Sequence, residues 1–183
     1  MEADPERIEQ LADERREENW EFREFLKGLD VEVQEFDAIV HKHHEEVSSQ
    51  IDCRACANCC REASPVLTEP DMSRLAAALG VSAPALVERY LEPDEHETAG
   101  FVFRDAPCPF LSDNLCAVYE SRPKDCRSYP HPQDEEMAFH LIQVVENCSI
   151  CPIVYHVFER MKEELWNIPY EDWEDEWEDS PEQ

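Results

Sequence analysis

Cysteine is the residue type in this chain whose number and spacing could do chemistry. Four of the nine cysteines lie within eight consecutive residues, in a C-x2-C-x2-C-C run from Cys53 to Cys60. Side chains at i, i+3 and i+6 of a tight loop can turn inward around one centre, as the first three ligands of a bacterial ferredoxin do. Adjacent Cys59 and Cys60 cannot easily point the same way, so we expect the fourth thiol to serve a second centre or to bridge. Buried free cysteines can act as small hydrophobes, but four in eight residues predict a metal site instead.

The other five cysteines stand singly along the chain, at Cys108, Cys116, Cys126, Cys148 and Cys151. Cys108 and Cys151 are followed by proline, as cluster ligands of ferredoxins often are, although the x3-C-P that would continue the run itself is absent. One compact run completed by scattered cysteines favours an iron–sulfur cluster, with a 4Fe–4S cluster preferred. Zinc stays open, because eight thiolates could hold two zinc ions with four cysteines each, one cluster with spare thiols, or two clusters. A disulfide framework is not expected, because the N-terminus has no apolar export signal and the number of cysteines is odd.

Two later stretches extend the cysteine pattern: Cys108-Pro-Phe-Leu, and Cys116-Ala-Val-Tyr119-Glu-Ser-Arg122-Pro123-Lys-Asp-Cys126-Arg127-Ser-Tyr129-Pro130. Together with the run, they resemble the YkgJ-type cysteine-cluster family, whose members are described as zinc- or iron-chelating proteins and to which a flagellin lysine N-methylase branch is related. The resemblance covers about residues 51–155 and implies eight metal ligands: Cys53, Cys56, Cys59, Cys60, Cys108, Cys116, Cys126 and Cys151. It leaves Cys148 as the surplus cysteine, unless Cys148 exchanges roles with Cys151.

Basic and aromatic residues near the cysteines are candidates for contact with the bound group. Arg122 and Tyr129 are suited to hydrogen-bond a sulfur or to lock the loop. Four basic residues lie within two positions of a cysteine and are suited to offset thiolate charge: Arg54, Arg61, Lys124 and Arg127. Cys151 lies at the N-terminus of a predicted helix, where the helix dipole lowers the pKa of a thiol.

Composition excludes several other functions. The chain has 183 residues and only three glycines, so neither a G-x-G-x-x-G dinucleotide turn nor a P-loop can be written in it. Its net charge of −28 repels phosphate backbones and anionic lipid headgroups, so no nucleic acid and no membrane are expected as partners. No apolar run approaches the roughly 18–20 residues of a membrane span. These features predict a cytoplasmic protein.

Hydrophobic periodicity predicts the elements that must position the cysteines. The expected helices cover residues 4–27, 31–50, 72–79, 83–91 and 152–165. Asp30 is expected to cap the second of them, with His43 or His44 filling a gap in its apolar face. Thr68 opens a capping box, and Gly80 ends the helix that follows. Residues 101–103 are expected to form a strand that pairs with 109–111 or 115–118, around a turn at 112–114.

The expected fold class is α+β and mostly helical: a small metal-stapled cysteine-cluster domain with a few short strands, preceded by an N-terminal helical hairpin. We expect an acidic helical arm over residues 1–50, the cysteine-cluster metal-binding domain over 51–168 and an acidic tail over 169–183. The tail has no basic residue, so we expect it to be disordered, or to dock Trp173 and Trp177 on a basic protein partner.

Three functions stay open at this level. The preferred one is a cytoplasmic metal-binding protein whose iron–sulfur cluster or zinc has a structural or electron-transfer role. The second is a protein-modifying, methylase-like enzyme that uses the centre, although no catalytic residue is predicted and no cofactor-binding turn is recognisable. The third is a zinc-stapled interaction module that binds basic partners through its acidic segments.

Overall fold

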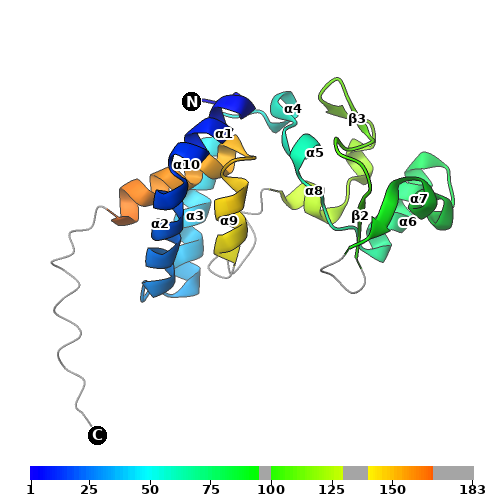
Figure 1. The fold of residues 1–183 in the computed structure, drawn as a ribbon. Coiled ribbons are helices and arrows are strands. Elements are labelled where there is room, and N and C mark those ends of the chain that lie inside the picture. Colours follow the sequence, from blue (N-terminus) through cyan, green and yellow to red (C-terminus); the bar gives the residue numbers. More distant parts are fainter. Residues whose placement is uncertain (95–99, 130–139, 167–183) are drawn as a thin grey trace, which may run out of the picture.

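The structure, a computed structural model, describes residues 1–94, 100–129 and 140–166. It confirms the predicted fold class, since the described chain is mostly helical with two small antiparallel sheets. Figure 1 shows a group of helices at one end, a second group containing α6, α7 and β2 at the other, and α4 and α5 between them. The predicted acidic tail lies outside the described residues.

The first group is built by helices from both ends of the chain. Its elements are α1 (Pro5–Glu14), α2 (Arg16–Gly28), α3 (Val33–Ser48), α9 (Leu141–Asn147), α10 (Pro152–Met161) and the π-helical turn η3 (Lys162–Trp166). Their apolar faces share one core, which we call the helical core. Inside it Phe22 packs edge-on against Phe158, with 5.1 Å between the two ring centroids. The segment predicted as an arm therefore packs against α10. The division of the chain into three domains stays a prediction.

The N-terminal helices differ in detail from the prediction. The single helix expected over 4–27 is two helices, because Arg15 leaves helical geometry at φ −108° and ψ 15°. Asn19, which interrupts the apolar stripe, is buried and accepts a hydrogen bond from the Lys162 ammonium at 2.6 Å. The predicted cap at Asp30 is wrong, because α3 begins later and Glu32 holds the N-cap position without a side-chain bond. His43 is buried in the α3 face, as predicted.

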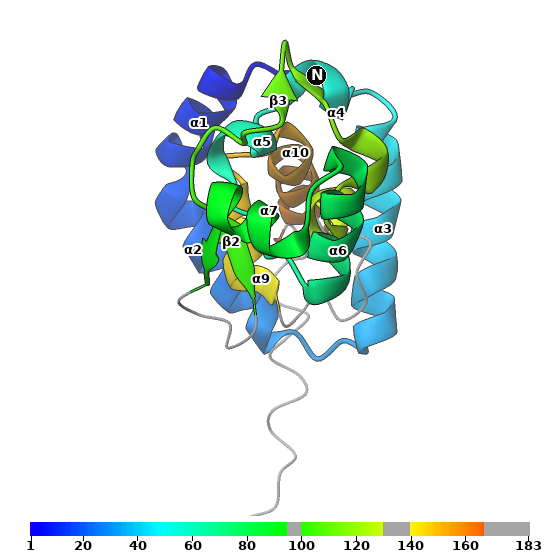
Figure 2. The same cartoon turned by 90° about the vertical axis from the view of Figure 1, so that its right-hand side faces the viewer.

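The second group forms a separate apolar cluster, which we call the hairpin core. It comprises α6 (Glu69–Leu79), α7 (Ala83–Tyr90), β1 (Leu91–Pro93) and β2 (Phe101–Phe103), which face the viewer in Figure 2. The predicted capping box is present, with Thr68 and Asp71 bonded reciprocally. Gly80 ends α6 in the left-handed conformation at φ +67°, and Ser82 caps α7.

The strands pair differently from the prediction. β2 pairs antiparallel with β1, in a register that places Phe103 opposite Leu91. Both side chains are buried in the hairpin core, and this shared burial is why the pairing expected with 109–111 or 115–118 is wrong. β3 (Leu111–Ser112) and β4 (Leu115–Cys116) pair with each other instead, around the predicted turn.

Short elements connect the two groups and carry most of the cysteines. They are α4 (Cys53–Cys56), α5 (Cys59–Glu62), the 3-10 turn η1 (Tyr119–Ser121) and α8 (Lys124–Ser128). None of the helices that the structure describes is both long enough and apolar enough to cross a membrane.

Candidate metal centre

The cysteine run folds into two single-turn helices with a sharp turn between them. Asp52 caps α4 by accepting a hydrogen bond from the Arg54 amide at 2.9 Å. Ala57 then adopts the left-handed conformation at φ +52°, which is uncommon for a residue other than glycine, and its amide donates to the Cys53 carbonyl at 2.9 Å. This turn lets the chain start α5 at once and keeps the run compact.

A side-chain bond joins the run to the distant C-terminal part of the chain. The Asn58 amide group donates to the carbonyl of Ile150 at 2.8 Å. Cys151 follows directly as the N-cap of α10, and its own amide donates to the Asn147 carbonyl at 2.8 Å. The bond therefore brings Cys151 to the run, from which it is far in sequence.

Main-chain bonds join the end of the run to the β3–β4 hairpin. The Cys108 amide donates to the Cys60 carbonyl at 2.8 Å, and the Leu111 amide donates to the Cys108 carbonyl at 3.0 Å. In the hairpin register Cys116 lies opposite Leu111. Asn114 at the hairpin tip accepts a hydrogen bond from the Arg61 guanidinium, so that the tip is tied back to α5.

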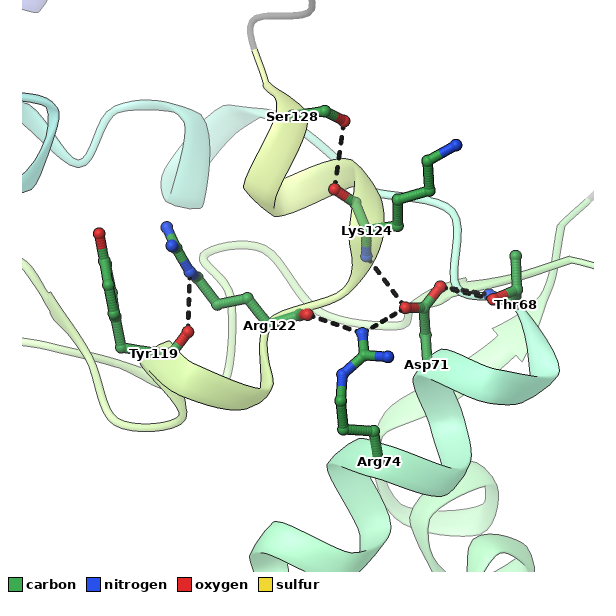
Figure 3. Close-up of polar contacts among 7 residues, drawn as sticks. All are labelled: Thr68, Asp71, Arg74, Tyr119, Arg122, Lys124 and Ser128. Carbon is green, nitrogen blue, oxygen red and sulfur yellow. Dashed lines mark hydrogen bonds and ion pairs between the residues drawn. The ribbon is translucent and has the colours of Figure 1, made fainter.

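Cys126 is positioned by the buried carboxylate of Asp71. Asp71 Oδ1 accepts the Lys124 amide at 3.0 Å at the start of α8, and it also pairs with Arg74 at 2.5 Å (Figure 3). A second carboxylate, that of Asp125 on α8 itself, accepts a hydrogen bond from the Val66 amide at 3.0 Å. α8 is thereby held to both α6 and the segment that follows α5.

Arg122 lies over the ring of Tyr119, with its guanidinium carbon 3.5 Å from the ring centroid. Its Nε donates to the Tyr119 carbonyl at 2.9 Å, and its own carbonyl accepts a bond from Arg74 at 2.9 Å (Figure 3). The guanidinium interacts electrostatically with three thiols: Cys53, Cys60 and Cys116. Arg122 is therefore placed to offset thiolate charge. The role expected of it, to hydrogen-bond a sulfur or to lock the loop, stays a prediction.

The adjacent cysteines of the run, Cys59 and Cys60, differ in acidity. A hydrogen bond between the two side chains, with Cys59 as donor, lowers the pKa of Cys60 to about 6 against the effect of burial. The charges of Arg122 and Arg61 lower it further. The same hydrogen bond raises the pKa of Cys59, and burial and the charge of Cys60 add to that rise. Cys60 is thus the more acidic thiol of the pair and Cys59 the less acidic one.

Three remote thiols lie near Cys60 and near one another. Burial is the largest cause of the raised pKa of Cys108, Cys116 and Cys126, the last reaching about 12. The charge of Cys60 raises the pKa of all three. The charge of Cys116 also raises the pKa of Cys108 and of Cys126, and the charge of Cys108 raises that of Cys126. Every pair among the four thiols therefore interacts.

The pKa of Cys151 was expected to be lowered by the helix N-terminus, and this prediction is wrong. Burial raises the pKa of this thiol to about 12, although the amides of Val154 and Ile153 at the start of α10 oppose the rise. The charges of Cys53 and Cys56 also raise it. The helix N-terminus acts as predicted, but 7% exposure makes the thiolate costlier than those two amides can offset.

Tyr129 lies on the same side of the site as Cys151. Burial raises the pKa of its hydroxyl, and the charges of Cys151 and Cys59 add to the rise. The hydroxyl donates to the Asn147 side-chain oxygen at 3.2 Å, which holds the ring against the helical core. Arg127, the other candidate from this motif, is exposed on α8, and its role stays a prediction.

Cys148 is the most deeply buried of the nine cysteines. It is 1% exposed within the helical core, where its thiol donates to the Val144 carbonyl at 3.3 Å. Burial raises its pKa to about 12. A thiol that packs as a small hydrophobe with a local bond fits the surplus role, which stays a prediction.

The eight candidate ligands thus lie on α4, α5, the loop before β3, β4, α8 and the start of α10. Among the described residues, no group of three or more His, Cys, Asp or Glu side chains is arranged as around a single bound metal ion. Sequence reasoning missed four positioning residues, Asn58, Asp71, Arg74 and Asn114. The Thr68 capping box contains Asp71 and the predicted turn contains Asn114, but neither pattern reveals a role at the site, because the bonds that hold the cysteines join residues remote in sequence.

Comparison with known proteins identifies the family. No curated protein and no solved structure matches the chain. A family model does match residues 52–152, which is more than half of the 183 residues. The model is that of the CxxCxxCC family, described as "Putative zinc- or iron-chelating domain", and the matched range spans every cysteine of the chain. The chain therefore belongs to the CxxCxxCC family of zinc- or iron-chelating domains.

Proposed function

We propose that this protein holds an iron–sulfur cluster of the 4Fe–4S type on Cys53, Cys56, Cys59 and Cys151. One observation carries the proposal: the tie between Asn58 and the Ile150 carbonyl brings Cys151, followed by a proline, to a C-x2-C-x2-C run. Three cysteines at this spacing, completed by a remote Cys-Pro, are the ligand pattern of a ferredoxin-type 4Fe–4S cluster.

The surroundings of these four thiols suit such a group. Cys151 interacts electrostatically with Cys53, Cys56 and Cys59, which is expected of side chains that face one space. Tyr129 covers the side nearest the helical core, where it would limit access of water. The cation of Arg122 would offset part of the negative charge that thiolates and cluster carry together.

The proposed role is structural or electron-transferring, in the cytoplasm. When bound, the cluster supplies one-electron chemistry, and the cysteines hold it while the surrounding charges set its potential. Its ligands come from residues 53–59 and from residue 151, so binding to the folded state alone stabilises the contact between the two parts of the chain. No contact of the described residues singles out a substrate, so an enzyme is not proposed.

The test is the composition of protein purified without oxygen. We expect brown protein that absorbs near ~400 nm, with iron and acid-labile sulfide in equal amounts. Cys56→Ser and Cys151→Ser should each lose that absorption, whereas the matched control Cys148→Ala should keep it. Colourless protein with zinc and no sulfide, even after reconstitution with iron and sulfide, would overturn the proposal.

A further inference from the structure

We infer that Cys60, Cys108, Cys116 and Cys126 form a second metal centre, separate from the proposed cluster. The adjacent residues Cys59 and Cys60 then belong to different centres. We call these four residues the hairpin thiols, and Cys53, Cys56, Cys59 and Cys151 the run thiols. This second centre rests on the proposed function in one respect only, that the cysteines of this chain bind metal as thiolates. It holds whether each centre contains zinc or an iron–sulfur cluster, since either takes four thiolates.

The division starts from the geometry of α5. Cys59 and Cys60 are its first two residues, and successive side chains of a helix point about 100° apart. Two adjacent thiols on one helix therefore face different spaces.

The main chain assembles the hairpin thiols without help from the other set. The Cys108 amide bonds to the Cys60 carbonyl at 2.8 Å, and the β3–β4 register holds Cys116 beside them. Cys126 arrives on α8, which Asp71 and Asp125 hold through main-chain amides. Each hairpin thiol thus comes from a different segment: α5, the loop before β3, β4 and α8.

Electrostatic interactions separate the same two sets. Every pair of hairpin thiols interacts, as the raised pKa values of Cys108, Cys116 and Cys126 record. Cys151 interacts with the other three run thiols. Cys59 links the two sets, since it interacts with Cys60 and Cys126 as well as with Cys151. The charge of Arg122 acts on Cys53 in one set and on Cys60 and Cys116 in the other.

The two sets also rest on different cores. Cys151 is a member of the helical core, whereas Cys108 packs against the hairpin core. A centre on the run thiols would join α4 and α5 to the helical core. A centre on the hairpin thiols would join α5, the β3–β4 hairpin and α8 around the hairpin core. Two separate centres therefore match the two-part architecture in Figure 1.

The experiment measures metal and sulfide per chain in set-selective variants of the full chain. Cys56→Ser removes a run thiol, Cys116→Ser removes a hairpin thiol, and Cys148→Ala is the matched control outside both sets. We expect each serine variant to lose one centre and to keep the other with its full metal content. Loss of all metal in both serine variants, or full retention in Cys116→Ser, would overturn the division.

A second measurement does not depend on the folding of variants. Metal-free wild-type protein is titrated with Co²⁺, and the free thiols are alkylated and mapped at each step. We expect two equivalents to bind, with each equivalent protecting four thiols of one set. Protection of all eight thiols by the first equivalent, or of sets that mix Cys60 with Cys151, would overturn the inference. Zinc on both sets of thiols in native protein would overturn the proposed iron–sulfur cluster but would still agree with two separate metal centres.

Discussion

The amide of Cys108 donates a hydrogen bond to the carbonyl oxygen of Cys60 at 2.8 Å. This main-chain bond brings the loop before the β3–β4 hairpin against the end of the cysteine run. Because it uses no side chain, the approach of the two cysteines is set by the path of the backbone. The tie on the other side of the run is different in kind, since it depends on the side chain of Asn58.

The dependence on Asn58 can be measured with Asn58→Ala. The substitution removes the bond to the Ile150 carbonyl, and we expect it to lower the free energy of unfolding by about 1 kcal/mol. It should also speed metal loss from the run thiols, because Cys151 is no longer tied to them. Chemical denaturation and metal release to a chelator measure the two effects. Gln50→Ala, which removes a local bond to the Glu46 carbonyl, is the control and should leave metal release unchanged.

Arg122→Met should weaken metal retention in both thiol sets. Its cation interacts with Cys53, Cys60 and Cys116, and the substitution leaves their thiolate charge less compensated. We expect metal release to a chelator to be roughly tenfold faster, which corresponds to about 1.4 kcal/mol. With a cluster bound, its reduction potential should fall, because the extra electron of the reduced cluster is no longer stabilised by the nearby cation of Arg122. Arg89→Met, at an exposed arginine in the last turn of α7, is the control and should leave metal release unchanged. An equal effect there would contradict the role assigned to Arg122.

Asp71→Asn should destabilise the fold and change its response to acid. Burial opposes ionisation of Asp71, but bonds from Thr68, Arg74 and Lys124 outweigh it and lower its pKa. A lowered pKa means that this stabilisation is present above the carboxyl's unfolded value and is lost as pH falls through the folded value. We expect Asp71→Asn to cost about 3 kcal/mol at neutral pH.

The stability of metal-free protein should therefore depend less on pH in Asp71→Asn than in wild type, below about pH 4. Urea unfolding at a series of pH values measures this. Glu69→Gln, an exposed acid in the first turn of the same helix, is the control and should keep the wild-type pH slope. Parallel curves for wild type and Asp71→Asn would contradict the assignment.

Lys162→Met should destabilise the helical core without affecting the metal. The Lys162 ammonium is buried and bonds to Asn19 at 2.6 Å and to Glu159 at 2.7 Å. Its removal leaves the Asn19 side chain without that partner in the core, at a cost of about 2 kcal/mol. Thermal unfolding and metal analysis should show a lower Tm with unchanged metal content. Lys42→Met removes an exposed pair with Glu164 and should cost less than about 1 kcal/mol.

Much of the fold was predictable because its signals are local. Thr68 and Gly80 bound their helix as predicted, and Pro152 starts α10, since caps and turns depend on neighbours a few residues away. The break at Arg15 was not predictable in this way. It depends on how the first two helices pack on α10, where Asn19 meets Lys162 from the other end of the chain.

The pairing of β2 shows the same limit. A three-residue strand carries too little pattern to choose a partner, and burial of Phe103 with Leu91 decided it. The pKa of Cys151 also depended on tertiary burial. A helix N-terminus is visible in the sequence, whereas the burial that reverses the sign of the shift is not.

The sequence by itself determined the kind of chemistry, because thiols at this spacing in an acidic chain with few glycines suit metal binding and little else. Only the tertiary structure decided which thiols share a space. Cys59 and Cys60 are neighbours in sequence, yet Cys59 interacts with Cys151 whereas Cys60 interacts with Cys108 and Cys116, and Cys126 interacts with both. The physical reason is that the grouping depends on which remote segments the two apolar cores and the long-range hydrogen bonds bring to α5.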